Sequence, residues 1–153
     1  MIVAAQAYTT GEQAKSAFGK VNPYEHGVLP VLLVIENTGK QVLRLENLKV
    51  QYIDSARRKL SDIPAKDLPY LRAPQRPNMN TPLPGIKLKR KNPLAALEIE
   101  GRAFAAKMLP PGDQANGFFY FQVDHRPGAI LYVTGISEAA TGKELFYIEV
   151  PLD

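Results

Sequence analysis

The chain of 153 residues has no cysteine and no tryptophan, and its only histidines are His26 and His125. The lack of cysteine excludes disulfide bonds, thiol catalysis and thiolate zinc sites. No apolar run approaches the roughly 20 residues of a membrane-spanning helix, because the longest, 28–35, is broken by Pro30. We therefore expect no transmembrane segment. An apolar content of 45% argues against disorder, and the length predicts a single domain over residues 1–153.

Catalytic and metal-binding motifs are scarce as well. None of the four serines lies in a G-x-S-x-G turn, and no metal-binding spacing accompanies either histidine. Asp124 and His125 are adjacent where a predicted strand ends and enters a turn, and neighbours on a strand point to opposite faces. Glu98 and Glu100 are interpreted as a charged edge. We predict no catalytic residue, no metal site and no cofactor. A small hydrolase with loop-borne carboxylates stays an alternative, because paired carboxylates can come from separate elements.

The most informative stretch is residues 109–123, LPPGDQANGFFYFQV. Pro111 and Gly112 suit the second and third positions of a type II turn, since proline presets φ and glycine accepts a positive φ. A strand then begins near Gly117, and its apolar residues alternate to both sides: Phe119, Phe121 and Val123 on one, Phe118 and Tyr120 on the other. This pattern predicts an interior strand that is covered on both faces.

The remaining pattern predicts eight short strands, at 2–8, 28–37, 42–46, 48–54, 103–109, 118–124, 130–136 and 144–150. The turn sequence 37–40 predicts a hairpin between the second and third of them. Thr10 and Gln13 form a capping-box pattern for a helix over 10–18, and a short helix is expected over 93–100 after Asn92. A helical turn is expected around 65–71. Strands at this spacing predict an all-β, two-sheet sandwich with one or two short helices.

A proline-rich, basic insertion interrupts the strands at about 61–93. Residues 57–91 hold ten basic residues against two aspartates, a charge of +8, whereas the rest of the chain carries −4. The favoured interpretation is a solubilising loop. The alternative is binding of a polyanion or an envelope surface, without sequence-specific nucleic-acid recognition. Its candidate ligand-binding residues are Arg57, Arg58, Lys59, Lys87, Lys89, Arg90 and Lys91.

The aromatic residues of the C-terminal half allow two interpretations. They could form a stacking platform for sugars or bases, but their positions on alternating strands favour a place in the core. The residues concerned are Phe118, Phe119, Tyr120, Phe121, Tyr132, Phe146 and Tyr147.

The strand end Met108-Leu109, the turn Pro111-Gly112-Asp113 and the strand 117–121 together resemble the telokin-like, immunoglobulin-like sandwiches of bacterial exported proteins. Residues 31–39, VLLVIENTG, are similar to the central strand and turn of that family. The resemblance implies an immunoglobulin-like sandwich in the periplasm or cell envelope. It also implies a non-enzymatic binding or structural role, with a protein or an anionic envelope component as partner. The N-terminal MIVAAQAY is too short for a signal peptide, so we expect an export signal to have been removed.

Overall fold

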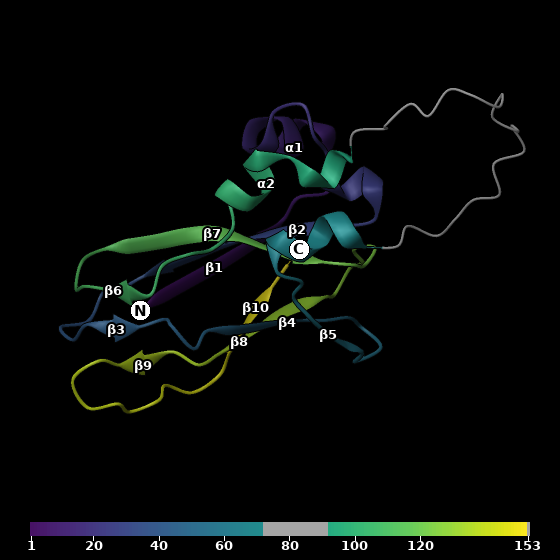
Figure 1. Ribbon diagram of the computed structural model, residues 1–153. Helices are drawn as coiled ribbons and strands as arrows, with labels where there is room; N and C mark the ends of the chain where they lie inside the picture. Colours follow the sequence, from purple (N-terminus) through teal and green to yellow (C-terminus); the bar gives the residue numbers. More distant parts are fainter. Residues whose placement is uncertain (72–91, 153) are drawn as a thin grey trace, which may run out of the picture.

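The computed structural model describes residues 1–71 and 92–152, and most of its elements are antiparallel strands (Figure 1). The all-β prediction is thus confirmed in its coarse form. The strands are β1 (Ile2–Ala7), β2 (Leu29–Glu36), β3 (Leu43–Arg44), β4 (Lys49–Ile53), β5 (Lys59–Ser61), β6 (Met108–Leu109), β7 (Gln114–Phe121), β8 (Ile130–Thr134), β9 (Ser137–Glu138) and β10 (Ile148–Pro151). The helical segments are α1 (Gly11–Phe18), η1 (Pro23–His26), η2 (Ala65–Tyr70), η3 (Pro93–Ala95) and α2 (Leu97–Gly101).

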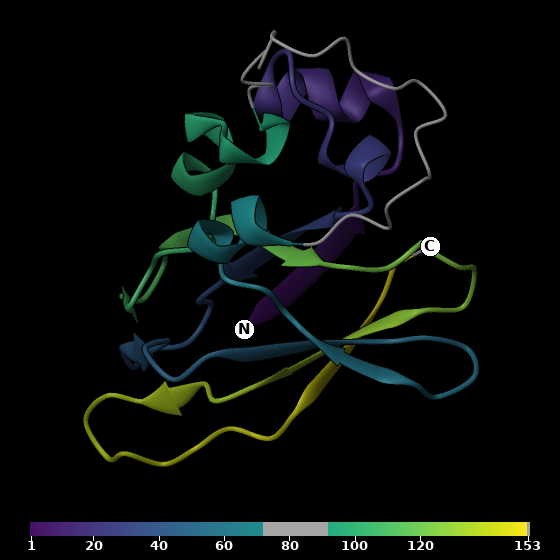
Figure 2. The same cartoon turned by 45° about the vertical axis from the view of Figure 1, so that its right-hand side comes forward.

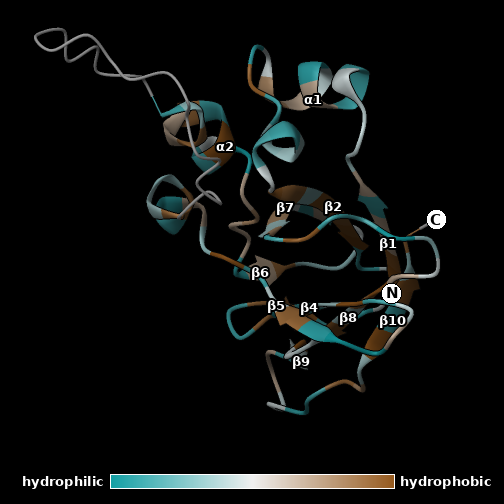
Figure 3. Cartoon of the chain, turned by 90° about the vertical axis from the view of Figure 1, so that its right-hand side faces the viewer, coloured by the Kyte–Doolittle hydropathy of each residue, from teal (hydrophilic) through white to brown (hydrophobic). Residues whose placement is uncertain are grey.

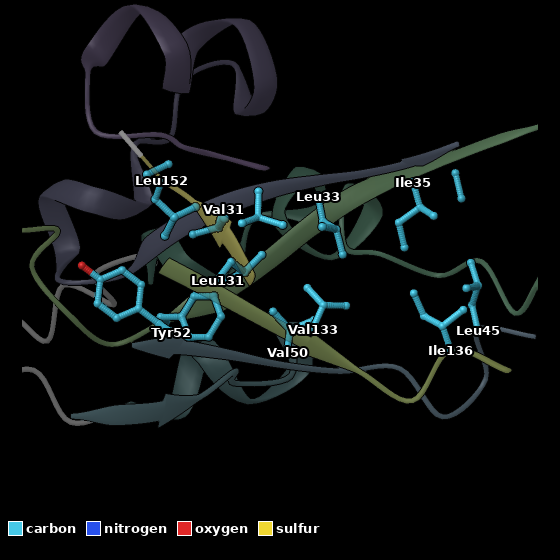
Figure 4. Packing of buried hydrophobic residues seen from close by; sticks show 14 of the residues in the cluster. Val31, Leu33, Ile35, Leu45, Val50, Tyr52, Leu131, Val133, Ile136 and Leu152 are labelled. Atoms are coloured by element: carbon cyan, nitrogen blue, oxygen red, sulfur yellow. The ribbon is translucent and has the colours of Figure 1, made fainter. Parts of the chain in front are cut away.

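Two larger sheets enclose the main hydrophobic core. One has the strand order β1-β2-β7 and the other β10-β8-β4-β5, while β6-β3-β9 forms a small third sheet. Figure 4 shows side chains of both larger sheets meeting between them. Because side chains alternate along a strand, every second residue reaches this core and the residues between them face outward. The inward residues include Val31, Leu33, Ile35, Val50, Tyr52, Leu131 and Val133.

A second core lies on the other face of the β1-β2-β7 sheet, where the helical segments cover it (Figures 1 and 2). Phe118 and Tyr120 of β7 point into this second core, whereas Phe121 points into the main core. The prediction that this strand is covered on both faces is confirmed. The Tyr120 hydroxyl donates a hydrogen bond of 2.5 Å to the backbone carbonyl of Ile99, which ties α2 to the sheet.

The local turn and cap predictions are also confirmed. Thr10 Oγ1 accepts a hydrogen bond from the Gln13 backbone at 3.3 Å, and the Gln13 side chain accepts one from the Thr10 backbone at 3.1 Å, which completes the capping box of α1. Gly112 has φ +80°, and the Asp113 N–H donates to the Pro110 carbonyl at 3.2 Å, as in a type II turn.

The predicted hairpin at 37–40 is wrong. The turn itself forms, because the Gly39 N–H donates to Asn37 Oδ1 at 3.0 Å. The strands beside it do not pair, since β2 pairs with β1 and β7 while β3 pairs with β6 and β9. The strand predicted over 103–109 shortens to β6, and two short strands, β5 and β9, were not predicted. Tertiary pairing, rather than local turn chemistry, selects these partners.

The ends of the predicted insertion belong to the folded body. Leu68 of η2 is fully buried and Leu94 of η3 is buried in the second core. The helix expected over 93–100 is divided, because Asn92 caps η3 and α2 begins only at Leu97. Residues 72–91 lie outside the described part of the chain.

Hydrophobic residues are concentrated in the strands of the two larger sheets, and α1 is mostly hydrophilic or neutral (Figure 3). Among the described residues, no helix has both the length and the apolar character needed to cross a membrane.

Candidate functional site

The face of the β10-β8-β4-β5 sheet that points away from the main core carries aromatic, polar and basic side chains. We name it the outward face. Its centre is Tyr132 of β8, which pairs with Gln51 of β4 on one side and Glu149 of β10 on the other. Further along β8 and β4, Thr134 pairs with Lys49. These side chains point away from the core because their neighbours in sequence point into it. The complete set is Lys49, Gln51, Ile53, Lys59, Ser61, Ile130, Tyr132, Thr134, Tyr147, Glu149 and Pro151.

Two tyrosines form a stacked pair on this face. The ring centroids of Tyr132 and Tyr147 lie 5.2 Å apart with an angle of 24° between the ring planes, and we name these residues the aromatic pair. Tyr147 is 59% exposed, and Phe146 beside it is 90% exposed. Exposed rings of this size supply a large contact area with little loss of side-chain freedom on binding.

The prediction that the aromatic residues lie mostly in the core holds for four of the seven, and the other three lie at the surface. Phe118, Tyr120 and Phe121 are buried and Phe119 packs against the main core. Tyr132 is half-buried, and Phe146 and Tyr147 are exposed, on the segment that enters β10. The sequence did not distinguish the two cases, because 145–148 is a continuous apolar run like 118–121, and in β7 that pattern is covered on both faces.

Lys59 of β5 places a positive charge beside the aromatic pair. Its Nζ lies 6.0 Å from the centroid of the Tyr132 ring. A cation at this distance is attracted by the electron-rich face of the ring, with a free energy of about 0.5–1 kcal/mol at an exposed site. The outward face thus combines stacking surface and charge at one position.

The hairpin between β4 and β5 is held by a buried aspartate. Asp54 is 4% exposed, and its carboxylate accepts the Arg58 backbone N–H at 2.9 Å and the Arg58 Nε at 2.7 Å. The backbone hydrogen bond is the main reason that the pKa of Asp54 lies below its usual value, with the Arg58 guanidinium adding to it. The same hairpin places Arg57 at φ +63°, a conformation that is strained for any residue other than glycine.

The three basic residues predicted in this hairpin consequently differ in what they can bind. Arg58 is already paired with Asp54, Lys59 lies over Tyr132, and Arg57 is exposed at the turn. The other four predicted basic residues lie outside the described residues, so their part in binding stays a prediction. They are Lys87, Lys89, Arg90 and Lys91.

We expect Asp54→Asn to weaken the acid dependence of stability. Because the pKa of Asp54 is lower in the folded state, the Asp54 carboxylate stabilises the fold above the unfolded-state pKa of about 3.8. This stabilisation is lost as the pH falls through the folded-state pKa. The variant should be less stable than the wild type at pH 7, and the difference should shrink at pH 2–3. Urea unfolding at both pH values measures it.

The control for Asp54 is Arg58→Gln, which removes the guanidinium but keeps the backbone N–H at position 58. It should lose less stability at pH 7 than Asp54→Asn does. An equal or larger loss in Arg58→Gln would mean that the side-chain ion pair, and not the backbone bond, sets the contribution of Asp54.

Two carboxylates share a second, smaller site. Asp62 and Glu100 line a cavity of about 280 Å³ between β7 and the helical segments, together with Lys66. Partial burial raises the pKa of Asp62 above its ordinary value. Glu100 is exposed, in accord with its interpretation as a charged edge. The sequence spacing did not connect Asp62 with Glu100, because 38 positions separate them and only the fold brings them together.

His125 is held by hydrogen bonds to core tyrosines. Its Nδ1 lies 3.2 Å from the Tyr52 hydroxyl, and its backbone N–H donates to the Tyr24 hydroxyl at 3.2 Å. The imidazole also lines a cavity of about 530 Å³ along β1, where Thr9 lies but no described residue of the lining is a carboxylate. These contacts give His125 a structural role at the end of the main core.

In the described part of the chain, no three His, Asp or Glu residues gather closely enough to hold a metal ion. Compared with known proteins, the chain matches no protein-family model, and no curated protein matches its sequence.

Proposed function

We propose that the protein is a non-enzymatic binding module and that it holds an extended glycan chain on the outward face. The observation that carries the proposal is the aromatic pair, in which the exposed Tyr147 stacks on the half-buried Tyr132, on a sheet whose opposite side faces the main core. Aromatic rings present a flat apolar surface against which the C–H faces of sugar rings pack, and the tyrosine hydroxyls stay available for hydrogen bonds.

The side chains around the aromatic pair suit a sugar polymer. Gln51 and Glu149 flank Tyr132 and supply hydrogen-bond donors and acceptors for sugar hydroxyls. Lys59 and Lys49 lie at opposite ends of the face. The position of β4 that pairs with Lys59 is four residues from Lys49, which corresponds to about 13 Å along the strand. A ligand that crosses this distance over a sheet surface is an extended chain.

We include in the same proposal a more specific fold than the all-β class. We infer that the two larger sheets form an immunoglobulin-like sandwich of the telokin-like kind, supported by their shared core and by the turn at Gly112. An extracytoplasmic location follows from that resemblance and fits a glycan ligand of the cell envelope. An antibody signal in the envelope fraction would support the location.

We expect Tyr147→Ala to reduce glycan affinity about tenfold, because the exposed ring supplies about 1–3 kcal/mol of stacking. The measurement is affinity electrophoresis in gels cast with a panel of neutral and acidic polysaccharides, namely dextran, hydroxyethylcellulose, polygalacturonate and heparin. Tyr70→Ala is the matched control, because Tyr70 is 84% exposed but lies on η2, on the helical side of the molecule. Retardation by no polysaccharide, or the same loss in both variants, would contradict the proposal.

A small hydrolase is the second candidate, and one observation favours it: Asp62 and Glu100 line the same cavity, and burial raises the pKa of Asp62 as a general acid requires. The two candidates differ in what happens to a bound polysaccharide over time. We expect no new reducing ends on prolonged incubation. Their release by the wild type, and its loss in Asp62→Asn, would replace the binding module with a hydrolase.

A further inference from the structure

A polar cavity adjoins the aromatic pair at one end of the outward face. Its volume is about 350 Å³. Arg44 of β3, Lys49 of β4 and Thr134 of β8 line it from three different strands. The full lining is Arg44, Asn47, Lys49, Thr134, Gly135, Ser137, Gly142 and Glu144.

The cavity and the aromatic pair form one continuous surface. Thr134 lies two residues beyond Tyr132 on the same side of β8, and it pairs with Lys49. On the other side, β10 pairs with β8 from Ile148, opposite Val133. Continuing this register by one residue places Tyr147 opposite Thr134. A chain that packs on Tyr147 therefore reaches the cavity with its next unit.

The cavity is lined by two cations, Arg44 and Lys49, and by one carboxylate, Glu144, but in the described part of the chain neither cation lies within 4.0 Å of a carboxylate oxygen. Within the described residues, the one ion pair joins Arg58 to Asp54, so neither Arg44 nor Lys49 is paired. Arg44 is half-buried, which weakens the screening of its charge by water. A guanidinium presents parallel N–H donors that match the two oxygens of a carboxylate.

The remaining lining suits a sugar ring. Thr134 and Ser137 offer hydroxyls, Asn47 an amide and Glu144 a carboxylate, which together donate to and accept from the hydroxyls of a sugar. The volume of the cavity is near the lower end of the range for small-molecule sites, which matches a single ring. Its backbone is also held closely, because a Cβ at Gly135 would lie only 2.0 Å from the Asn47 carbonyl oxygen.

We propose that this cavity binds the carboxylate of an acidic sugar, with Arg44 and Lys49 as its charged partners, so that the glycan is a polyuronate-type chain. This inference rests on the proposed function, since it assigns the ligand class of the same surface. The sugar next to the acidic unit packs on the aromatic pair. The acidic group then fixes the position of the chain along the face, and stacking on Tyr147 adds affinity that does not depend on charge.

The experiment compares polygalacturonate with its carboxyl-reduced derivative, which has the same backbone without the charge, and with dextran sulfate. We expect the wild type to bind polygalacturonate at least tenfold more tightly than either of the others. Arg44→Gln should remove most of this preference, because it should weaken binding of polygalacturonate much more than binding of the reduced polymer. Lys40→Gln, which makes the same kind of charge change on the exposed turn at 37–40, should have little effect.

Arg44→Lys, which keeps the charge but loses the paired donors, should fall between the wild type and Arg44→Gln, and thermal unfolding confirms that each variant is folded. Equal wild-type affinity for the acidic and reduced polymers, with Tyr147→Ala still weakening both, would overturn the acidic subsite and leave the proposed function standing. Tighter binding of dextran sulfate, or an equal loss in Lys40→Gln, would likewise overturn the carboxylate assignment. An effect of Arg44→Gln on polygalacturonate with none from Tyr147→Ala would support the subsite and contradict the stacking surface.

Discussion

Replacing Gly135 by alanine is expected to lower the free energy of unfolding by about 2–5 kcal/mol, from two causes that add. Gly135 has φ +85°, a left-handed conformation that costs an L-residue about 1–2 kcal/mol. A Cβ there would also lie 2.0 Å from the carbonyl oxygen and 2.8 Å from the carbonyl carbon of Asn47. Both contacts are to backbone, so no side chain can rotate away and β8 must move from the segment before β4.

Gly112→Ala isolates the conformational cause. Gly112 has φ +80°, and its added Cβ would meet no atom within 4 Å. This variant should lose only about 1–2 kcal/mol. Urea denaturation measures both, as a shift of the midpoint with an unchanged slope. Equal losses of stability in the two variants would show that the close contact between Asn47 and Gly135 does not contribute to the effect of the substitution.

Replacing Asn37 by leucine is expected to cost about 3 kcal/mol, because three backbone groups lose their partner at once. Asn37 is 2% exposed. Its Nδ2 donates to the carbonyls of Gln41 at 2.8 Å and Leu109 at 2.9 Å, and its Oδ1 accepts from the Gly39 N–H at 3.0 Å. These bonds hold the segment that leaves β2 against β6, in place of the hairpin that the turn sequence predicted.

Asn116→Leu is the matched control for Asn37. It makes the same change at an exposed position of β7, where a substitution usually alters stability by less than about 0.5 kcal/mol. Urea midpoints of the two variants give the comparison. A loss below about 1 kcal/mol in Asn37→Leu would mean that the backbone bonds of residue 37 to the Gly112 turn hold the crossing without the side chain.

Short-range features of this protein were readable from the sequence alone. The capping box of Thr10 and Gln13 and the turn at Gly112 depend on residues within four positions of each other, and both form as predicted. The two-sided cover of β7 was also readable, because a strand with apolar residues on both sides has no face left for water. In each case the physical cause lies within the segment itself.

The candidate site could be predicted only in part. Lys59 was among the expected binding residues, and Tyr132 and Tyr147 were considered only in the less favoured interpretation as a stacking platform. Arg44 and Lys49 were not expected to bind a ligand. Tyr132 lies between buried residues of β8, in a run in which every residue is apolar or aromatic. Such a run does not show which residues face the core, so the outward orientation of Tyr132 could not be predicted. Arg44 and Thr134 are 90 positions apart, and no local rule connects them.

The sequence by itself determined that the chain is rich in strands, where its main turns lie and which segments have an apolar face. The tertiary structure alone decided that β2 and β3 belong to different sheets, that Asp62 and Glu100 share a cavity, and that Tyr147 stacks on Tyr132. The physical reason is that turns and caps are set by neighbouring dihedral angles and hydrogen bonds. Strand partners and surface sites depend instead on which distant segments bury their apolar faces together.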